Sequence, residues 1–366
     1  MYLRKKLFIL IVSISLFAHK QALAASNAYI ISGEGTVIKI NLPENNIITT
    51  TTLMYADHII SSGEVAIDIP NSLLAVSSGR FSQDVYLYNL ATLTFIKKLN
   101  IFSNDYDRIL PQVIFLPNAS FFYVLWKDPA TGDVMVSSYN KSSFTKNADI
   151  SVSPPLKGKV ILSSDGSRLY SILSKYNSGN GQPLINQYSS DTFSFITSTI
   201  MSFSPNAFAK VIDDIKSGKV LLVENLKSSR SSPDNLMFFT QNITTGVLSP
   251  QIVTNSAGND YITPDAAQLI FIPTRDITDS LGLVVDVQTT GLIKFYNINS
   301  GSHITTLTFS NENNLAVIGI SPDSRFLYIE ASDAITDQSM LFVIDLNSHL
   351  IVKKFSNIDG AFMVFF

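Results

Sequence analysis

Apolar and polar residues alternate with a period of two along much of this chain, and this pattern predicts β-strands. The segments Val85–Tyr88 and Leu341–Ile344 are rich in β-branched and aromatic residues and have the length of strands. Gly, Asn, Asp, Ser and Pro interrupt such runs about every 8–12 residues, and no long helical periodicity competes with them. We therefore predict an all-β fold built from hairpins.

A longer repeat groups these hairpins. Each copy consists of an apolar strand, a turn that begins at an Asn, Asp or Ser, and a second strand. The turn residues are Asn41, Asn89, Asn140, Ser189, Asn242, Asn297 and Asp345. Successive turn residues lie 48 to 55 positions apart. A period near 50 residues with about four strands is typical of the blades of a β-propeller, so seven copies predict seven blades.

The other half of the repeat reads as a strand, a tight turn and a strand. The segment 318–329 has Ser321-Pro322-Asp323 at its turn, and its near copy 160–170 has Ser164-Asp165-Gly166. An Asp side chain at such a position accepts hydrogen bonds from nearby backbone N–H groups, and Gly supplies a positive φ. We interpret these Asp residues as parts of turns rather than as catalytic carboxylates.

Together, the two halves carry a family resemblance. The segment SPDSRFLYI followed by LFVIDLNSHLIVKKF resembles the YVTN-type repeat, and SSDGSRLY with INQYSSDTFSFI is a poorer copy. The Tyr-Val-Thr-Asn tetrad itself is absent, and Leu73–Ser77 and Leu327–Ala331 occupy its place. The resemblance implies a propeller of the broad WD40/YVTN-like group that includes surface-layer repeat proteins and lactonase-like enzymes. It specifies a fold and not a chemistry.

The two ends of the repeat region predict how the ring closes. The first turn motif follows the segment Ala28–Ser32 directly, so the first blade lacks its innermost strand at the N-terminal end. The chain ends in the apolar segment Gly360–Phe366, which has no later partner. We predict that this tail is the missing strand and that it closes the circle, leaving no open edge. A terminal Phe366 is also typical of outer-membrane barrels, but the blade period disfavours that reading.

The N-terminal residues are typical of a secretory signal peptide. Arg4, Lys5 and Lys6 precede the apolar run Leu7–Ala18, and Ala22-Leu23-Ala24 supplies small residues for cleavage after Ala24. A retained membrane anchor is the alternative, although His19, Lys20 and Gln21 make the run shorter than the roughly 20 apolar residues of a spanning helix. We expect residues 1–24 to be a signal peptide. Residues 25–366 would then form a single propeller domain in the periplasm or outside the cell, without a transmembrane segment.

Composition narrows the range of partners. Residues 1–24 hold four basic and no acidic residues, so the remaining chain has 22 basic and 29 acidic residues and a net charge of −7. This balance, without any basic run, disfavours nucleic acid as a partner. The chain has no cysteine, which excludes disulfides and thiolate chemistry, and the three His of residues 25–366 fall in different repeats, which disfavours a zinc site. We expect a monomer without a cofactor or a metal.

Candidate binding residues come from the loops that usually carry propeller ligands. These loops lead into the first strand of a blade or connect its second and third strands, and they hold Asp, Arg, Tyr, His and Trp side chains. No GxSxG, P-loop or HExxH motif is present, so no residue is assigned a catalytic role. The candidates are Asp57, His58, Asp105, Tyr106, Arg108 and Tyr261 in the first kind of loop, and Arg80, Trp126, Tyr176 and Arg275 in the second.

Two functions fit this sequence. The first is a non-catalytic propeller that presents these loops to a protein, a peptide or a glycan. The second is a lactonase- or lyase-like enzyme that acts on a small polar substrate at the channel mouth, where carboxylates would hold a divalent cation and His58 or Asp105 would assist. The absence of a recognisable catalytic set favours the first.

Overall fold

The computed structural model describes the chain from Asn27 to Phe366 with gaps. The gaps are 33–34, 43, 56–57, 60–61, 79–83, 102–110, 129–132, 155, 157–159, 164, 174–183, 202–207, 217, 226–235, 255–257, 279–283, 337, 359 and 361. Side chains are also not described at 55, 58–59, 62–63, 78, 127, 172–173, 208–216, 223–225, 275–278, 284–289, 313 and 362. No helix within the described part is long and apolar enough to cross a membrane.

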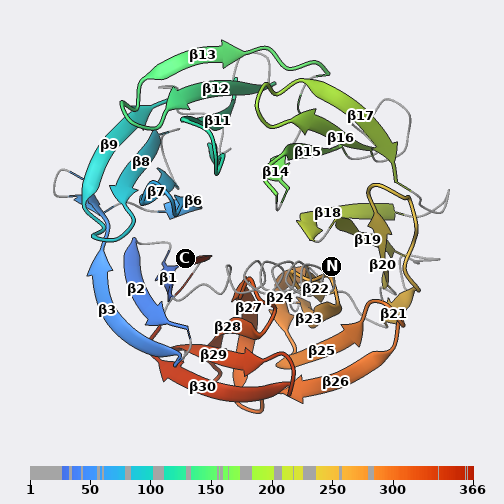
Figure 1. Cartoon of the computed structure of the whole chain (residues 1–366). Coiled ribbons are helices and arrows are strands. Elements are labelled where there is room, and N and C mark those ends of the chain that lie inside the picture. Colours follow the sequence, from blue (N-terminus) through green and yellow to red (C-terminus); the bar gives the residue numbers. More distant parts are fainter. Residues whose placement is uncertain are drawn as a thin grey trace, which may run out of the picture.

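The described strands form seven antiparallel sheets arranged as blades around a central channel, which confirms the predicted seven-bladed propeller (Figure 1). From the channel outwards, blade 1 contains β31 (Phe362–Phe365), β1 (Asn27–Ile31), β2 (Thr36–Asn41) and β3 (Asn46–Thr52). In the same direction, blade 2 contains β6 (Ser62–Asp68), β7 (Leu73–Ser78), β8 (Asp84–Asn89) and β9 (Phe95–Asn100). Blade 3 contains β10 (Gln112–Phe115), β11 (Phe121–Lys127), β12 (Val134–Asn140) and β13 (Lys146–Ile150).

The remaining blades follow the same order around the ring. Blade 4 contains β14 (Val160–Leu162), β15 (Arg168–Leu173), β16 (Leu184–Ser189) and β17 (Phe195–Ile200), and blade 5 contains β18 (Phe208–Lys216), β19 (Lys219–Asn225), β20 (Leu236–Asn242) and β21 (Ile252–Thr254). Blade 6 contains β22 (Gly258–Ile262), β23 (Gln268–Thr278), β25 (Leu292–Asn297) and β26 (His303–Thr308), and blade 7 contains β27 (Glu312–Ile320), β28 (Phe326–Asp333), β29 (Ser339–Asp345) and β30 (Leu350–Ser356). A small pair, β4 (Met54–Tyr55) and β5 (His58–Ile59), lies between blades 1 and 2.

The C-terminal strand closes the ring as the sequence predicts. β31 pairs antiparallel with β1, with Ile30 opposite Met363, and so supplies the innermost strand of blade 1. Asn27 and Phe366 exchange two backbone hydrogen bonds of 2.9 Å. The first and last described segments therefore share one sheet, which removes the open edge that a broken ring would expose.

Apolar side chains pack between the blades. Side chains alternate between the two faces of a strand, so each blade can bury residues against both of its neighbours. In the described part of the chain, seven hydrophobic clusters form in this way, one between each pair of adjacent blades. This division into seven similar clusters explains why a chain without disulfides can hold a closed ring.

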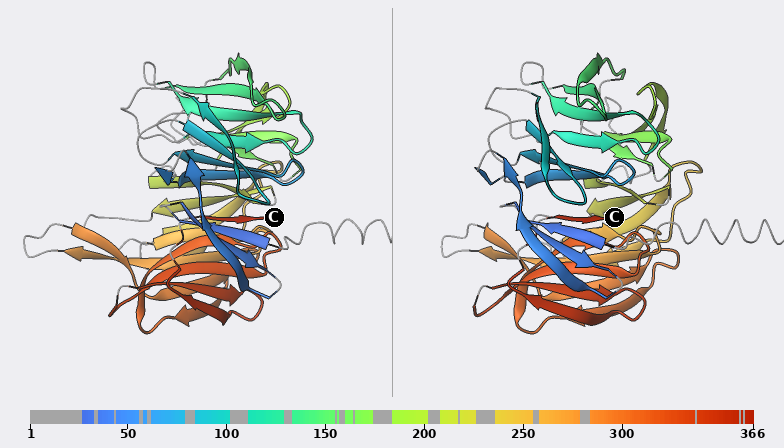
Figure 2. Two further views of the ribbon diagram at one scale, coloured as in Figure 1. Left: turned by 90° about the vertical axis from the view of Figure 1, so that its left-hand side faces the viewer. Right: turned by 60° about the vertical axis from the view of Figure 1, so that its left-hand side comes forward.

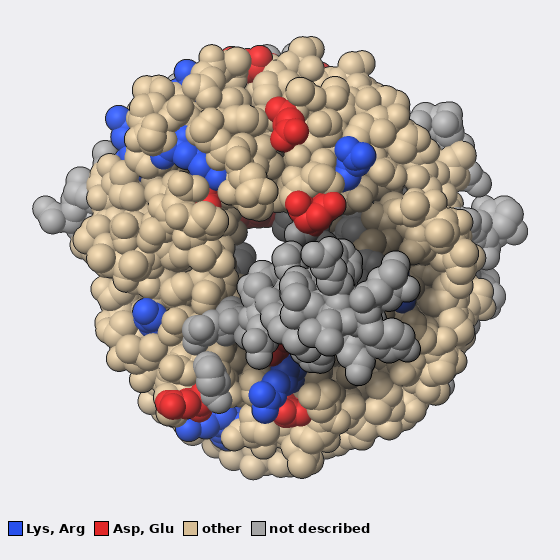
Figure 3. Space-filling view, in the orientation of Figure 1, with Lys and Arg blue, Asp and Glu red and all other residues tan. Residues whose placement is uncertain are grey.

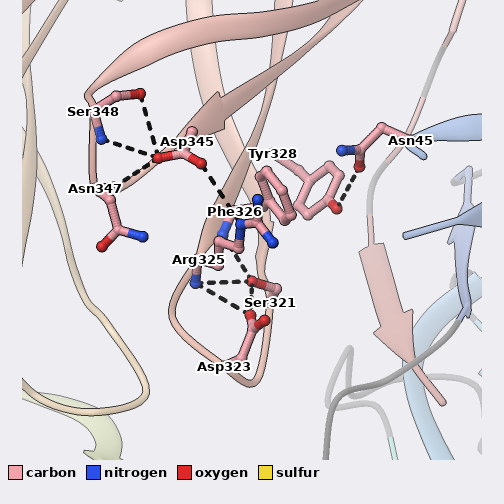
Figure 4. Close-up of polar contacts among 9 residues, drawn as sticks. All are labelled: Asn45, Ser321, Asp323, Arg325, Phe326, Tyr328, Asp345, Asn347 and Ser348. Atoms are coloured by element: carbon pink, nitrogen blue, oxygen red, sulfur yellow. Dashed lines mark hydrogen bonds and ion pairs between the residues drawn. The ribbon is translucent and has the colours of Figure 1, made fainter. Parts of the chain in front are cut away.

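The repeated turns are held by side-chain oxygens, as predicted. In blade 7, Oδ1 of Asp345 accepts hydrogen bonds from the backbone N–H groups of Asn347 (2.9 Å) and Ser348 (3.0 Å) (Figure 4). Oδ1 of Asp323 accepts one from the hydroxyl of Ser321 (2.6 Å) and one from the backbone N–H of Arg325 (3.1 Å). Local bonding of this kind fixes a turn without help from the rest of the fold.

The same arrangement recurs in blade 4. The hydroxyls of Ser163 and Ser167 and the backbone N–H of Ser167 all donate to the carboxylate of Asp165. These bonds, led by the one from Ser163, lower the pKa of Asp165 to about 2. The Asp residues of these turns are therefore structural.

Buried tyrosines connect neighbouring blades. In three blades a tyrosine on the second strand donates a hydrogen bond to the turn between the third and fourth strands of the next blade, and Figure 4 shows the bond that joins blade 7 to blade 1. Each hydroxyl finds its partner outside its own sheet, so these bonds fix how adjacent blades sit against each other. They run from Tyr29 to the carbonyl of Leu90 (2.7 Å), from Tyr123 to the carbonyl of Ser190 (2.9 Å) and from Tyr328 to Oδ1 of Asn45 (3.0 Å).

Candidate functional site

The two faces of the ring carry different connections. On one face, which we call the turn face, the first strand of each blade connects to the second and the third to the fourth. On the other, the loop face, the second strand connects to the third, and the fourth leads into the next blade. On the loop-face side, the described strands β9 and β10 are separated by 11 residues of sequence, and β15 and β16 and likewise β19 and β20 by 10, and no turn-face connection between described strands is as long.

Blade 6 carries an additional hairpin on the loop face. β23 pairs with β25 through residues 268–271, continues to Thr278, and there pairs with the inserted strand β24 (Val284–Thr289). Figure 2 shows this orange hairpin projecting from one side of the ring, whereas the C-terminus lies at the opposite side. Long and unequal connections on one face of a regular scaffold are where propellers and other folds usually carry function.

The side chains of most of the predicted binding residues lie outside the described part of the structure. Asp57, Arg80, Asp105, Tyr106, Arg108 and Tyr176 lie outside the described residues. His58 lies in β5 and Arg275 in β23, but their side chains are outside the described part. Only Trp126 and Tyr261 are described with their side chains, and they belong to blades 3 and 6.

The prediction that Tyr261 and Arg275 lie in loops is wrong, whereas Trp126 is the last residue but one of the strand β11. Tyr261 pairs within blade 6 and Arg275 pairs with the inserted strand β24, because backbone pairing continues further than the residue types suggest. β22 reads Gly-Asn-Asp-Tyr-Ile, which contains three weak strand formers, yet it pairs with β23 from Gly258 to Ile262. A Cβ atom at Gly258 would overlap the carbonyl oxygen of Ile272, so Gly258 is needed for close packing within this blade.

Trp126 takes part in the hydrogen bonding of its own blade. Its Nε1 donates to Oγ of Ser137 (3.0 Å), whose hydroxyl donates to Oδ1 of Asp149 (2.6 Å), and Lys146 forms an ion pair with the same oxygen (2.6 Å). Burial acts to raise the pKa of Asp149, but the bonds from Lys146 and Ser137 outweigh it and lower that pKa. The half-buried indole thus crosses from β11 towards β13 and stabilises the sheet.

Tyr261 lines a cavity at the wall of the central channel. The cavity has a volume of about 230 Å³ and lies between the innermost strands of blades 6 and 7, which Figure 1 places at the inner edge of the ring. Burial raises the pKa of the half-buried Tyr261, a backbone hydrogen bond with Val317 partly opposes this shift, and Asp260 adds to it. The lining residues are Tyr261, Ile262 and Pro264 from blade 6 and Val317, Ile318, Gly319 and Ile320 from blade 7.

The four lining residues of blade 7 were not among the predicted site residues. The segment Val317–Ile320 reads in sequence as an ordinary apolar strand. Its register with β28 shifts between Asn313 and Ala316 and again between Val317 and Gly319. Such bulges bend a strand and occur often beside binding sites, and Gly319 at the second shift is a residue type that points to one.

Charge is sparse on the face seen in Figure 3. The described acidic and basic side chains there are scattered and of both signs, and the channel opens at the centre. Within the described ranges, no group of three or more His, Asp or Glu residues could hold a metal ion. Within the described residues, the cavity beside Tyr261 is lined by side chains without charge, of which the phenol of Tyr261 alone is polar.

Comparisons with known proteins identify the fold. No family model matches the chain, and no curated protein sequence matches it. It is similar to the structure of hydrazine synthase from Kuenenia stuttgartiensis, with 12% identity over 87% of this chain and 94% of that chain and a TM-score of 0.54. It is also similar to the dihydro-heme d1 dehydrogenase NirN in complex with DHE, with 11% identity over 93% of this chain and 75% of that chain and a TM-score of 0.55. At such identities the likeness establishes the propeller fold alone.

Proposed function

We propose that this chain is an exported, non-catalytic β-propeller that binds a protein, a peptide or a glycan on its loop face. The observation that carries this proposal is the difference between the two faces. On the loop-face side, three pairs of described strands are separated by ten or more residues of sequence and blade 6 carries the additional strand β24, whereas every connection between described strands on the turn face is shorter. Variation confined to one face favours a binding role for that face.

Among propellers, we propose that the blades of this chain are of the YVTN type. It is supported by blade 7, where the Ser321-Pro322-Asp323 turn and the Asp345 turn are held by the local hydrogen bonds expected of that repeat. The Thr263–Asp265 turn of blade 6 and the Ser163–Asp165 turn of blade 4 follow the same bonding scheme.

Export can be tested separately from binding. The leader-like residues 1–24 support secretion to the periplasm or beyond, with cleavage after Ala24. N-terminal sequencing of the protein recovered outside the cytoplasm should start at Ala25. Recovery of an uncleaved chain from the membrane fraction would contradict this part of the proposal.

The binding role is tested by two matched double variants. The protein without residues 1–24 is immobilised and exposed to the native envelope fraction and to a glycan array. Arg80→Ala/Tyr106→Ala changes the loop face. Arg168→Ala/Phe195→Ala removes an arginine and an aromatic ring from exposed positions at the turn face and serves as the control.

We expect the loop-face variant to lose the captured partner at least tenfold and the control variant to retain it. Equal capture by all three proteins would show that the loop face is not the binding surface. Circular dichroism spectra of the three proteins establish that each is folded.

A further inference from the structure

The cavity between blades 6 and 7 has a shape set by the backbone. Two bulges bend β27, and Gly319 allows it to lie directly against the C-terminal strand β31 of blade 1. A Cβ atom at Gly319 would lie 2.8 Å from Cβ of Met363 and 3.2 Å from a ring carbon of Phe365. β27 therefore packs tightly on its blade 1 side, and the hollow lies on the side that faces β22 and Tyr261.

A hydrogen bond also joins the two turns that follow the strands of the cavity, β22 and β27. The backbone N–H of Asp265, in the turn after β22, donates to Oγ of Ser324 in the turn after β27 (3.0 Å). Val317 and Ile320 pack, together with Tyr261, against the hydrophobic cluster between blades 6 and 7. The walls are thus held by packing and by a bond between neighbouring blades, which keeps the cavity preformed.

The chemistry of the walls restricts what can enter. The seven lining residues include no charged side chain and a single polar one, the phenol of Tyr261. A tyrosine phenol is protonated at neutral pH, and burial raises the pKa of this one further, so it can donate a hydrogen bond. An ionic ligand would lose its hydration without gaining a partner of opposite charge in the cavity, which is costly.

The volume of the cavity restricts the size of the ligand. An apolar cavity of about 150 Å³ is sufficient to bind benzene. The cavity beside Tyr261 measures about 230 Å³, so it accommodates one ring with a short substituent.

We propose that this cavity binds a small, uncharged, ring-sized ligand that is mostly apolar and carries one hydrogen-bond acceptor for Tyr261. The site opens on the channel wall and uses no residue of the loop face. It therefore goes beyond the proposed function, and an experiment can refute the ligand site without refuting the loop-face binding role, or the reverse.

The test uses two probes of nearly equal size, acetophenone, which has a carbonyl acceptor, and ethylbenzene, which has none. Each is titrated into the purified protein by isothermal calorimetry, with saturation-transfer NMR to detect weak binding. We expect saturable binding of both probes, and tighter binding of acetophenone by about fivefold, the magnitude of one hydrogen bond.

Three variants locate the site. Val317→Phe fills the cavity and should weaken the binding of both probes at least tenfold. The matched control Val352→Phe makes the same exchange on the exposed outer strand of blade 7, where Val352 is 48% exposed, and should change neither affinity. Tyr261→Phe should reduce acetophenone to the affinity of ethylbenzene and leave ethylbenzene unchanged.

The outcomes that overturn the proposal are equally specific. They are no saturable binding of either probe, equal affinities in wild type and Val317→Phe, or equal loss of both probes in Tyr261→Phe. Circular dichroism and urea unfolding establish that each variant is folded. If Val317→Phe does not fold, the response of Tyr261→Phe to the two probes still decides the question.

Discussion

Replacing Lys141 by Met should destabilise the propeller strongly, because this residue forms a buried ion pair between blades 2 and 3. Its Nζ lies 2.6 Å from Oδ2 of Asp68, and the two side chains are 5% and 1% exposed. Nζ also donates to the carbonyl of Leu116 (2.6 Å), and Asn71 donates to the same Asp68 oxygen (2.9 Å). The ammonium group is thus the main partner of a carboxylate that water does not reach.

The expected magnitude follows from what the substitution leaves behind. Removing one member of a buried pair costs about 3–5 kcal/mol, because the other charge stays buried without compensation. In the double variant Asp68→Asn/Lys141→Met no charge remains, and the loss is mainly the bond to Leu116, worth about 1 kcal/mol. The single variant should therefore be less stable than the double variant by about 2–4 kcal/mol.

Urea unfolding at pH 7, followed by circular dichroism, gives the free energies of unfolding. Lys146→Met serves as the control, because Lys146 forms a 2.6 Å ion pair with Asp149 inside blade 3 and the two side chains are 44% and 51% exposed. We expect that control to lose about 1 kcal/mol or less. If the single and double variants at Lys141 unfold with equal free energies, the reasoning from buried charge is wrong.

Three further predictions concern stability. Tyr328→Phe removes the hydroxyl that joins blade 7 to blade 1 and should cost about 1 kcal/mol in urea unfolding, and an unchanged midpoint would contradict the role of this bond. Gly319→Ala places a Cβ atom 2.8 Å from Met363 and should cost about 1–3 kcal/mol, whereas a neutral result would mean that β27 can move away from β31. Burial lowers the pKa of His349, so below about pH 6.5 the unfolded chain binds more protons and stability should fall towards pH 5. His349→Asn, which suits the positive φ of this position, should flatten that dependence, and an unaltered pH slope would exclude His349 as its source.

The parts of the fold that could be predicted are those fixed by short-range chemistry. In blade 3, for example, the side chain of Asn140 accepts hydrogen bonds from the backbone of Ser142 and Ser143, two and three residues further along the chain. Such a turn needs no distant partner, so its residue types recur in each copy of the repeat. The number of copies therefore predicts the number of blades. Ring closure was predictable for a related reason, since an apolar strand at 360–366 had no other place to pair.

The links between blades could not be predicted, because they join positions far apart in the sequence. Lys141 reads as a surface lysine in a turn, and only the packing of blade 3 on blade 2 brings it to Asp68. His349 likewise lies in an exposed hairpin by sequence, yet its ring packs against Phe295 of blade 6 at 4.8 Å, and its Nε2 lies 3.1 Å from Oε1 of Gln268. Long-range contacts of this kind depend on the angle between two sheets, which no local pattern encodes.

The candidate site shows the same division between local and long-range causes. A search by residue type selects polar and aromatic side chains in expected loops, and it found Tyr261 although it placed that residue in a loop rather than in a strand. It could not find Val317 and Ile320, because aliphatic residues in a strand are the normal content of a core. They line the cavity where β27, whose register with β28 shifts twice, lies close to β31 at Gly319 and faces β22. The sequence signal of this backbone geometry is Gly319, because a glycine inside a strand often marks a bulge or the close approach of a neighbouring strand.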